Sequence, residues 1–311
     1  MTPVAKKILV PTDFSSCAQR AEDYAAYLAK ASGAELALLS VAEFVPGMDL
    51  DYPVNKMYVE ALQKEARVAL EQAERRLGAL GLTVERHQEI GVPSHWISQK
   101  AREIKADAIV MGTHGRTGLQ HVLLGSTAER TMRMAPCPVL TVRVADEGAA
   151  ATAARAGSAP AFRQILVPVD FSDCSLEAVE YAAVLAAQFS AAVTVLHVLE
   201  PVTYGLDFTL LPIGGQEKNR KQVETRMAEV AEALRQKKVQ ASSKVIGGLP
   251  IDGILQTAVT LHGDLIVMGT HGRRGVSHLL LGSVVEGVMR RAPCPVLGVK
   301  SPKYETRTET K

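Results

Sequence analysis

Short apolar runs alternate along this chain with longer segments in which apolar residues recur every three or four positions. The runs have the length of buried strands, and the recurring segments have the period of amphipathic helices. This alternation is typical of βαβ units built around a parallel sheet. The predicted strands are residues 7–11, 35–41, 83–89, 108–112 and 139–144, and then 164–168, 192–198, 240–246, 265–269 and 296–299.

The second half of the chain repeats the first half. The segment Ile8–Ser15 (ILVPTDFS) returns 157 residues later as Ile165–Ser172 (ILVPVDFS). Of the 34 positions from 107 to 140, 24 are identical to their partners at 264–297, at the same offset of 157. We therefore predict two copies of one domain, at residues 1–145 and 162–302. Small residues at 146–161 indicate a linker, and 303–311 is a polar tail.

Composition narrows the class of protein. The 311 residues fit two domains of about 150 residues each, and 47% apolar with 22% charged residues is ordinary for a soluble globular chain. A net charge of +2 gives no overall attraction to nucleic acid or to an anionic membrane. No apolar run is long enough for a transmembrane helix, and four cysteines do not make a disulfide framework. We expect a cytoplasmic protein that binds neither nucleic acid nor membrane.

The clearest chemical signal is a glycine pattern that occurs once in each copy. Gly112-x-x-Gly115 is followed by nine residues and Gly125-Ser126, and the second copy has Gly269, Gly272 and Gly282-Ser283 at the same spacing. Each pattern begins where a predicted strand ends, which is where parallel sheets bind ligands. Glycines let backbone N–H groups approach phosphate oxygens, and a helix N-terminus suits an anion. The pattern indicates a phosphate site.

A purely structural interpretation of these segments is also open. Ser126–Glu129 and Ser283–Glu286 both have the Ser-x-x-Glu spacing of a capping box, which only begins a helix. Glycines after a strand are usually turn residues. Asp13 and Asp170 follow the first strand of each copy, where a carboxylate can accept hydrogen bonds from ribose hydroxyls. Their structural alternative is an Asx turn or a helix N-cap.

Together these motifs resemble the universal stress protein family. The resemblance rests on the glycine pattern, on a first strand ending in Pro-x-Asp, on Met-Gly-Thr-His-Gly-Arg, and on the closing Ala-Pro-Cys-Pro-Val-Leu of each copy. It implies two tandem doubly wound, Rossmann-like α/β domains, each with a five-stranded parallel sheet flanked by helices. It also implies an adenine nucleotide (ATP, ADP or AMP, optionally with magnesium) and a regulatory stress-response role. The resemblance further implies that sheet edges pair between the two domains in an intramolecular pseudo-dimer, and a homodimer of the chain is expected as well.

The resemblance assigns nucleotide-binding residues in both copies. In the first copy they are Pro11, Thr12, Asp13, Val41, Met111, Gly112, Gly115, Arg116, Gly125, Ser126 and Thr127. In the second copy they are Pro168, Val169, Asp170, Val198, Met268, Gly269, Gly272, Arg273, Gly282, Ser283 and Val284. The chain departs from ATP-binding members at Ala128 and Val285, where such members can place a hydroxyl, and Val284 removes a second hydroxyl from the second site.

Other residues with reactive side chains do not form a further motif. We expect His114 and His271 to orient the glycine loops through hydrogen bonds, and the cysteines to be free buried thiols without a metal. The single tryptophan, Trp96, is expected in the core, and the apolar segment 204–213 is expected to cover a pocket or meet a partner.

Two other functions stay open beside the nucleotide-binding regulator. One is an ATP-dependent enzyme for slow hydrolysis, phosphotransfer or adenylyl transfer, although the chain lacks a Gly-x-x-x-x-Gly-Lys-Ser/Thr loop and a Ser-Gly-Gly-x-Asp-Ser loop. The other is a nucleotide-free, chaperone-like interaction protein. We assign no catalytic residue, and at most slow ATP hydrolysis is expected.

Overall fold

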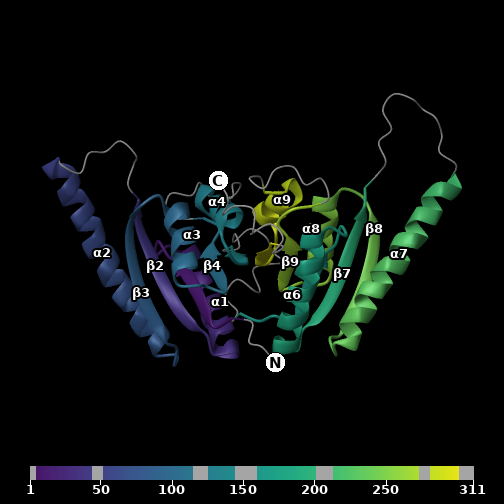
Figure 1. The fold of residues 1–311 in the computed structure, drawn as a ribbon, viewed down its shortest axis with the longest axis horizontal. Helices are drawn as coiled ribbons and strands as arrows, with labels where there is room; N and C mark the ends of the chain where they lie inside the picture. The colour runs from purple at the N-terminus through teal and green to yellow at the C-terminus, as the bar shows by residue number, and fades with distance from the viewer. Residues whose placement is uncertain are drawn as a thin grey trace. The chain divides into compact units, whose positions relative to one another are not determined.

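The computed structural model describes residues 5–43, 52–114, 125–143, 160–200, 213–272 and 281–300. The chain divides into two compact units, Met1–Ala161 and Phe162–Lys311. Each unit is an α/β domain whose described strands form a parallel sheet flanked by helices, as predicted (Figure 1). The predicted polar tail, most of the predicted linker and nearly all of the apolar segment at 204–213 lie outside the described residues.

The described strands of the first domain lie in the order β3-β2-β1-β4-β5. Its elements are β1 (Lys7–Pro11), α1 (Ser16–Ser32), β2 (Glu35–Glu43), α2 (Pro53–Gly78), β3 (Val84–Gly91), α3 (Pro93–Glu103), β4 (Ala108–Gly112), α4 (Ser126–Met134) and β5 (Val139–Val142). β2 extends two residues beyond its apolar run because its backbone stays paired with β3 as far as Glu43 and Gly91.

The second domain repeats this order as β8-β7-β6-β9-β10. Its elements are β6 (Gln164–Pro168), α6 (Asp173–Phe189), β7 (Ala192–Leu199), α7 (Ile213–Gln236), β8 (Ala241–Gly247), α8 (Pro250–Thr260), β9 (Leu265–Gly269), α9 (Ser283–Arg291) and β10 (Val296–Val299). In both domains the chain first adds strands on one side of the first strand and then returns to add strands on its other side.

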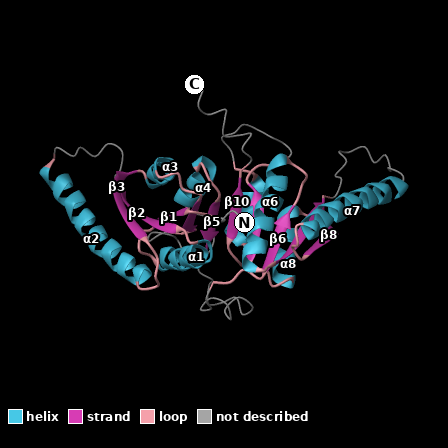
Figure 2. Cartoon of the chain, turned by 60° about the horizontal axis from the view of Figure 1, so that its bottom comes forward, coloured by secondary structure: helices cyan, strands magenta, loops and turns pink. Residues whose placement is uncertain are grey.

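This connectivity places helices on both faces of each sheet. Right-handed crossovers put α1 and α2 on one face and α3 and α4 on the other, and α3 packs against α4. Figure 2 shows α1 on one side of the strands of the first domain and α3 and α4 on the opposite side. Figure 1 shows α2 beside β3 and α7 beside β8. The central strands are therefore covered on both faces, which explains why Ile8, Leu9 and Ile109 are fully buried.

Capping residues and prolines mark the ends of several helices. Ser15 caps α1 by accepting a hydrogen bond from the Ala18 N–H at 3.2 Å, and Gly33 ends this helix with a φ of 70°. Pro93 and Pro250 open α3 and α8, where a missing N–H costs nothing. Among the described residues, no helix combines the length and the apolar character needed to cross a membrane.

The edge of the sheet where a ligand would bind follows from the strand order. Connections leave β1 toward β2 and leave β4 toward β5, so the carboxyl ends of β1 and β4 form a topological switch point. β6 and β9 form the corresponding point in the second domain.

Candidate functional site

The turn that follows the first strand of each domain is an Asx turn. Asp13 Oδ1 accepts hydrogen bonds from the Ser15 N–H at 3.1 Å and from Ser15 Oγ at 2.6 Å. Asp170 Oδ1 does the same for Ser172, at 3.0 and 2.6 Å. Phe14 and Phe171 both adopt a φ of 65°, so the two turns share one geometry. One carboxylate oxygen of each aspartate therefore shapes the turn, as the structural alternative predicted.

In the second domain, the other carboxylate oxygen of the aspartate lies against the glycine loop. A Cβ on Gly272 would lie 2.9 Å from Asp170 Oδ2, so a side chain at this position would collide with the carboxylate. Ser172 Oγ also lies 3.4 Å from the His271 carbonyl oxygen. The turn after β6 and the loop after β9 thus meet, and two candidate site residues 102 positions apart in sequence come together. Gly115, Arg116 and Arg273 lie outside the described residues.

The glycine loops are closed by main-chain hydrogen bonds at their bases. The Gly125 N–H donates to the Thr113 carbonyl at 2.9 Å, and the Gly282 N–H donates to the Thr270 carbonyl at 3.1 Å. A Cβ on Gly125 would lie 2.7 Å from the Thr113 carbonyl oxygen. Gly125 therefore allows the start of α4 to approach the end of β4.

The capping-box interpretation of the serines is wrong. The N-caps of α4 and α9 are Gly125 and Gly282, so Ser126 and Ser283 are already the first helical residues. Among the described residues, no side chain caps either helix. Because the N-cap residues are glycines without a side chain, these helix starts have the form that suits an anion, with the positive end of the helix dipole directed at it.

The first glycine of each pattern is required for packing. A Cβ on Gly112 would lie 2.9 Å from Cys17 Sγ and 3.1 Å from the Cys17 carbonyl carbon. A Cβ on Gly269 would lie only 2.6 Å from the Cys174 carbonyl carbon. These glycines bring the first turn of α1 or α6 against the end of β4 or β9. Cys17, Cys137 and Cys174 are buried free thiols, as predicted, whereas Cys294 is partly exposed.

Both histidines of the loops are held by their preceding threonines. His114 Nδ1 lies 2.9 Å from Thr113 Oγ1, and His271 Nδ1 lies 3.0 Å from Thr270 Oγ1. The Nε2 atoms of both histidines are buried. The expected loop-orienting hydrogen bond is therefore present. Within the described parts of the chain, no group of three or more His, Cys, Asp or Glu side chains is arranged to hold a metal.

Beneath the first site lies a buried polar cluster that sequence patterns did not reveal. Thr12 Oγ1 donates to Glu22 Oε1 at 2.8 Å, and Glu22 Oε2 is paired with Arg76 of α2. The Glu22 side chain is only 2% exposed, and this burial raises its pKa above the ordinary value of 4.5, against the opposing effects of Thr12 and Arg76. The Thr12 hydroxyl is thus engaged inside the protein.

The second domain supports the same turn with different residues. Val169 and Val179 replace Thr12 and Glu22. His197 lies where the first domain has Ser40, and its Nδ1 lies 2.6 Å from the Val169 carbonyl oxygen. A carbonyl oxygen can only accept, so this nitrogen carries a proton and donates. The Phe171 ring lies 5.1 Å from that imidazole, and Arg226 of α7 covers Phe171 at 4.0 Å.

The described candidate residues thus gather at the carboxyl ends of three strands and one helix start in each domain. Pro11 and Pro168 end β1 and β6, Met111 and Met268 lie in β4 and β9, Val41 and Val198 lie near the ends of β2 and β7, and Thr127 and Val284 lie in the first turns of α4 and α9.

Comparison with known proteins places this architecture in a family. The sequence profile described as the universal stress protein family matches residues 5–143 and again 161–300. The chain belongs to the universal stress protein family. A universal stress protein of Mycolicibacterium smegmatis is 30% identical over 303 residues, which cover 94% of this chain and 96% of that protein.

A single-domain match and a solved structure are consistent with this assignment. One domain of this universal stress protein is similar to a universal stress protein of Methanocaldococcus jannaschii, with 37% identity over 139 residues, 44% of this chain and 82% of that protein. The crystal structure of a universal stress protein from Archaeoglobus fulgidus has a TM-score of 0.71 and 23% identity, covering 96% of this chain and 97% of that one. The last comparison supports the fold alone.

Proposed function

We propose that each domain of this universal stress protein binds one adenine nucleotide, with ATP as the favoured ligand, and that the bound state regulates a cytoplasmic stress response. The observation that carries the proposal is the meeting of Asp170 with Gly272 beside an uncapped helix start. A carboxylate that suits sugar hydroxyls and a group of N–H donors that suits phosphate thereby share one edge of the sheet.

Different residues of the site bind different parts of the nucleotide. Asp13 and Asp170 accept hydrogen bonds from the ribose, and the first N–H groups of α4 and α9 bind phosphate oxygens. Ser126 and Thr127 add two hydroxyls in the first domain, whereas Ser283 and Val284 provide only one in the second. We therefore propose tighter phosphate binding in the first domain. Gly115, Arg116 and Arg273 enter this proposal through the family resemblance.

The chemistry of the described residues favours retention of ATP over rapid turnover. Fast phosphoryl transfer needs an oriented nucleophile and charge neutralisation at the γ-phosphate. The aspartates are engaged in their turns and at the ribose, Glu286 pairs with Arg290, and the Nε2 atoms of the loop histidines are buried. Magnesium, where present, would bind through the phosphates.

The assembly of the chain also belongs to this proposal. Two domains of this family in one chain fit an intramolecular pair, and we expect a homodimer of the whole chain in addition. Light scattering of the 311-residue chain tests the second expectation, because the homodimer has twice the chain mass of 33.3 kDa. A mass equal to one chain at all concentrations would contradict it.

Calorimetry with matched variants tests nucleotide binding. We expect two binding events for ATP in the wild-type chain and the loss of one event in Asp13→Ala and of the other in Asp170→Ala. Mass spectrometry of ligands released from the purified protein should show an adenine nucleotide. Unchanged binding in both variants would assign the aspartates to the turns alone, and absence of any nucleotide binding would refute the proposed function.

A further inference from the structure

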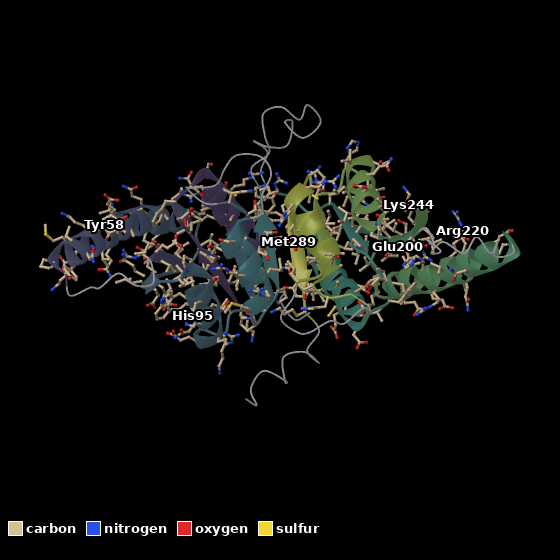
Figure 3. All side chains as sticks on the ribbon, turned by 90° about the horizontal axis from the view of Figure 1, so that it is seen from above. Tyr58, His95, Glu200, Arg220, Lys244 and Met289 are labelled. Atoms are coloured by element: carbon tan, nitrogen blue, oxygen red, sulfur yellow. The ribbon has the colours of Figure 1, made fainter. Side chains whose placement is uncertain are left out.

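The single tryptophan is fixed at the carboxyl edge of the first sheet, not in the core where the sequence suggested it. Trp96 lies in the first turns of α3 and stays partly exposed. Its indole Nε1–H donates to the Ile90 carbonyl oxygen at 2.7 Å. Figure 3 marks the adjacent His95, whose ring lies 6.1 Å from the indole in an edge-on contact.

The backbone around Trp96 is shaped to accept the ring. Gly91 has a φ of 135°, which favours glycine, and a Cβ there would lie 2.9 Å from the indole Nε1. A side chain at position 91 would therefore push the indole away from Ile90. The hydrogen bond, the glycine and the edge-on histidine together hold one orientation of the ring.

The Trp96 indole adjoins the adenosine side of the proposed nucleotide site. Ile90 is paired with Ala42 in the sheet, and Val41, a proposed adenosine-side residue, is the preceding residue of β2. The bond from Trp96 to Ile90 thus brings the indole to the ends of β2 and β3. Aromatic rings at such positions are suited to stacking on a planar base.

The second domain indicates which residue this helix position approaches. Gly253 occupies the position 157 residues after Trp96. A Cβ on Gly253 would lie 3.2 and 3.3 Å from the two methyl carbons of Val198 and 3.0 Å from Ile246 Cδ1. The same helix position therefore reaches the equivalent of Val41, but in the second domain it carries no ring.

We propose that Trp96 forms the base-side wall of the first nucleotide site and makes that site selective for purine nucleotides. This inference rests on the proposed function. The second site has Gly253, which carries no ring, at the corresponding position, and it therefore discriminates less between purine and pyrimidine bases. A purine offers a larger ring face than a pyrimidine, so the wall favours ATP over CTP in the first site only. The two sites are then unequal at the base, in addition to their unequal hydroxyls near the phosphates.

The wild-type chain carries its own reporter for this proposal. Because Trp96 is its only tryptophan, emission excited at the indole should change when ATP fills the first site. Asp13→Ala should abolish that change, and the matched Asp170→Ala should retain it. Calorimetry on the same samples records binding independently. Binding of ATP to both sites without any change in emission, or a change lost only in Asp170→Ala, would overturn the proposal. Absence of binding by calorimetry would refute the proposed function and this inference together.

A selectivity measurement separates a base wall from a merely structural tryptophan. In the Asp170→Ala chain, which retains the first site, Trp96→Leu should reduce the preference for ATP over CTP about tenfold, while Trp96→Phe should keep most of it. The same substitutions in the Asp13→Ala chain should leave the preference of the second site unchanged. Equal loss of ATP and CTP affinity in Trp96→Leu would show that Trp96 supports the fold only, and would overturn the proposal.

Discussion

Replacement of Arg76 by alanine tests the cluster beneath the first site. Arg76 is 44% exposed, whereas the Glu22 side chain with which it pairs is 2% exposed. The substitution leaves the carboxylate buried with Thr12 as its remaining neutral donor. Removing one partner of a fully buried pair costs ~3–5 kcal/mol. Because water already reaches Arg76, we expect a smaller loss of about 1–3 kcal/mol in the free energy of unfolding.

The loss should depend on pH in a defined direction. Burial raises the pKa of Glu22 above 4.5, so its contribution to stability is fully present below 4.5 and is lost as pH rises through the raised value. Without Arg76, the pKa in the folded state rises further. The destabilisation by Arg76→Ala should therefore be largest at neutral pH and should shrink on acidification, when a protonated Glu22 no longer needs a cation.

The second domain provides the matched control. It forms the same turn with Val169 and Val179, so Thr12→Val combined with Glu22→Val should be neutral or stabilising. Denaturant unfolding followed through Trp96 emission reports on the first domain selectively. If Arg76→Ala lowered the free energy of unfolding equally at all pH values, or if the double valine variant lowered it as much, the buried charge of Glu22 would not be the cause of the destabilisation.

Three further outcomes are expected. Gly269→Ala should lower the free energy of unfolding by ~1–3 kcal/mol, because its Cβ would lie 2.6 Å from the Cys174 backbone. Gly112→Ala should lower it by less, because the nearest atom to its Cβ is the Cys17 sulfur, at 2.9 Å. Thermal denaturation measures both, and Gly78→Ala, whose Cβ would meet no described atom within 4 Å, is the neutral control. Ser172→Ala should cost ~1 kcal/mol, because it removes the cap to the Ser175 N–H and one of the two hydrogen bonds that Asp170 Oδ1 accepts from residue 172. An unchanged melting curve would contradict this. ATP hydrolysis with magnesium should stay below ~1 s⁻¹, and faster turnover abolished by His114→Ala with His271→Ala would make the protein an enzyme.

Most of the fold could be predicted from the sequence, because hydrophobic periodicity and turn formation depend on residues only a few positions apart in the chain. The apolar runs predicted the strands to within a few residues, and the repeat at 157 positions predicted two domains. Where strand ends differ, as in β2, backbone pairing with the adjacent strand sets the end. An Asx turn was one of the open alternatives for Asp13 and Asp170, and both turns form because the partners, Ser15 and Ser172, lie only two residues away.

Contacts between distant residues decided the site. The role of Gly112 depends on Cys17, 95 positions away in sequence, and the partner of Glu22 lies 54 positions away on another helix. The start of α4 at Ser126 depends on the bond between Gly125 and the end of β4, which local capping patterns do not contain. Trp96 has the apolar character of a core residue, yet its bond to Ile90 holds it at the edge of the sheet. Sequence period specifies which face of an element is buried, whereas only packing determines which distant atoms that face meets.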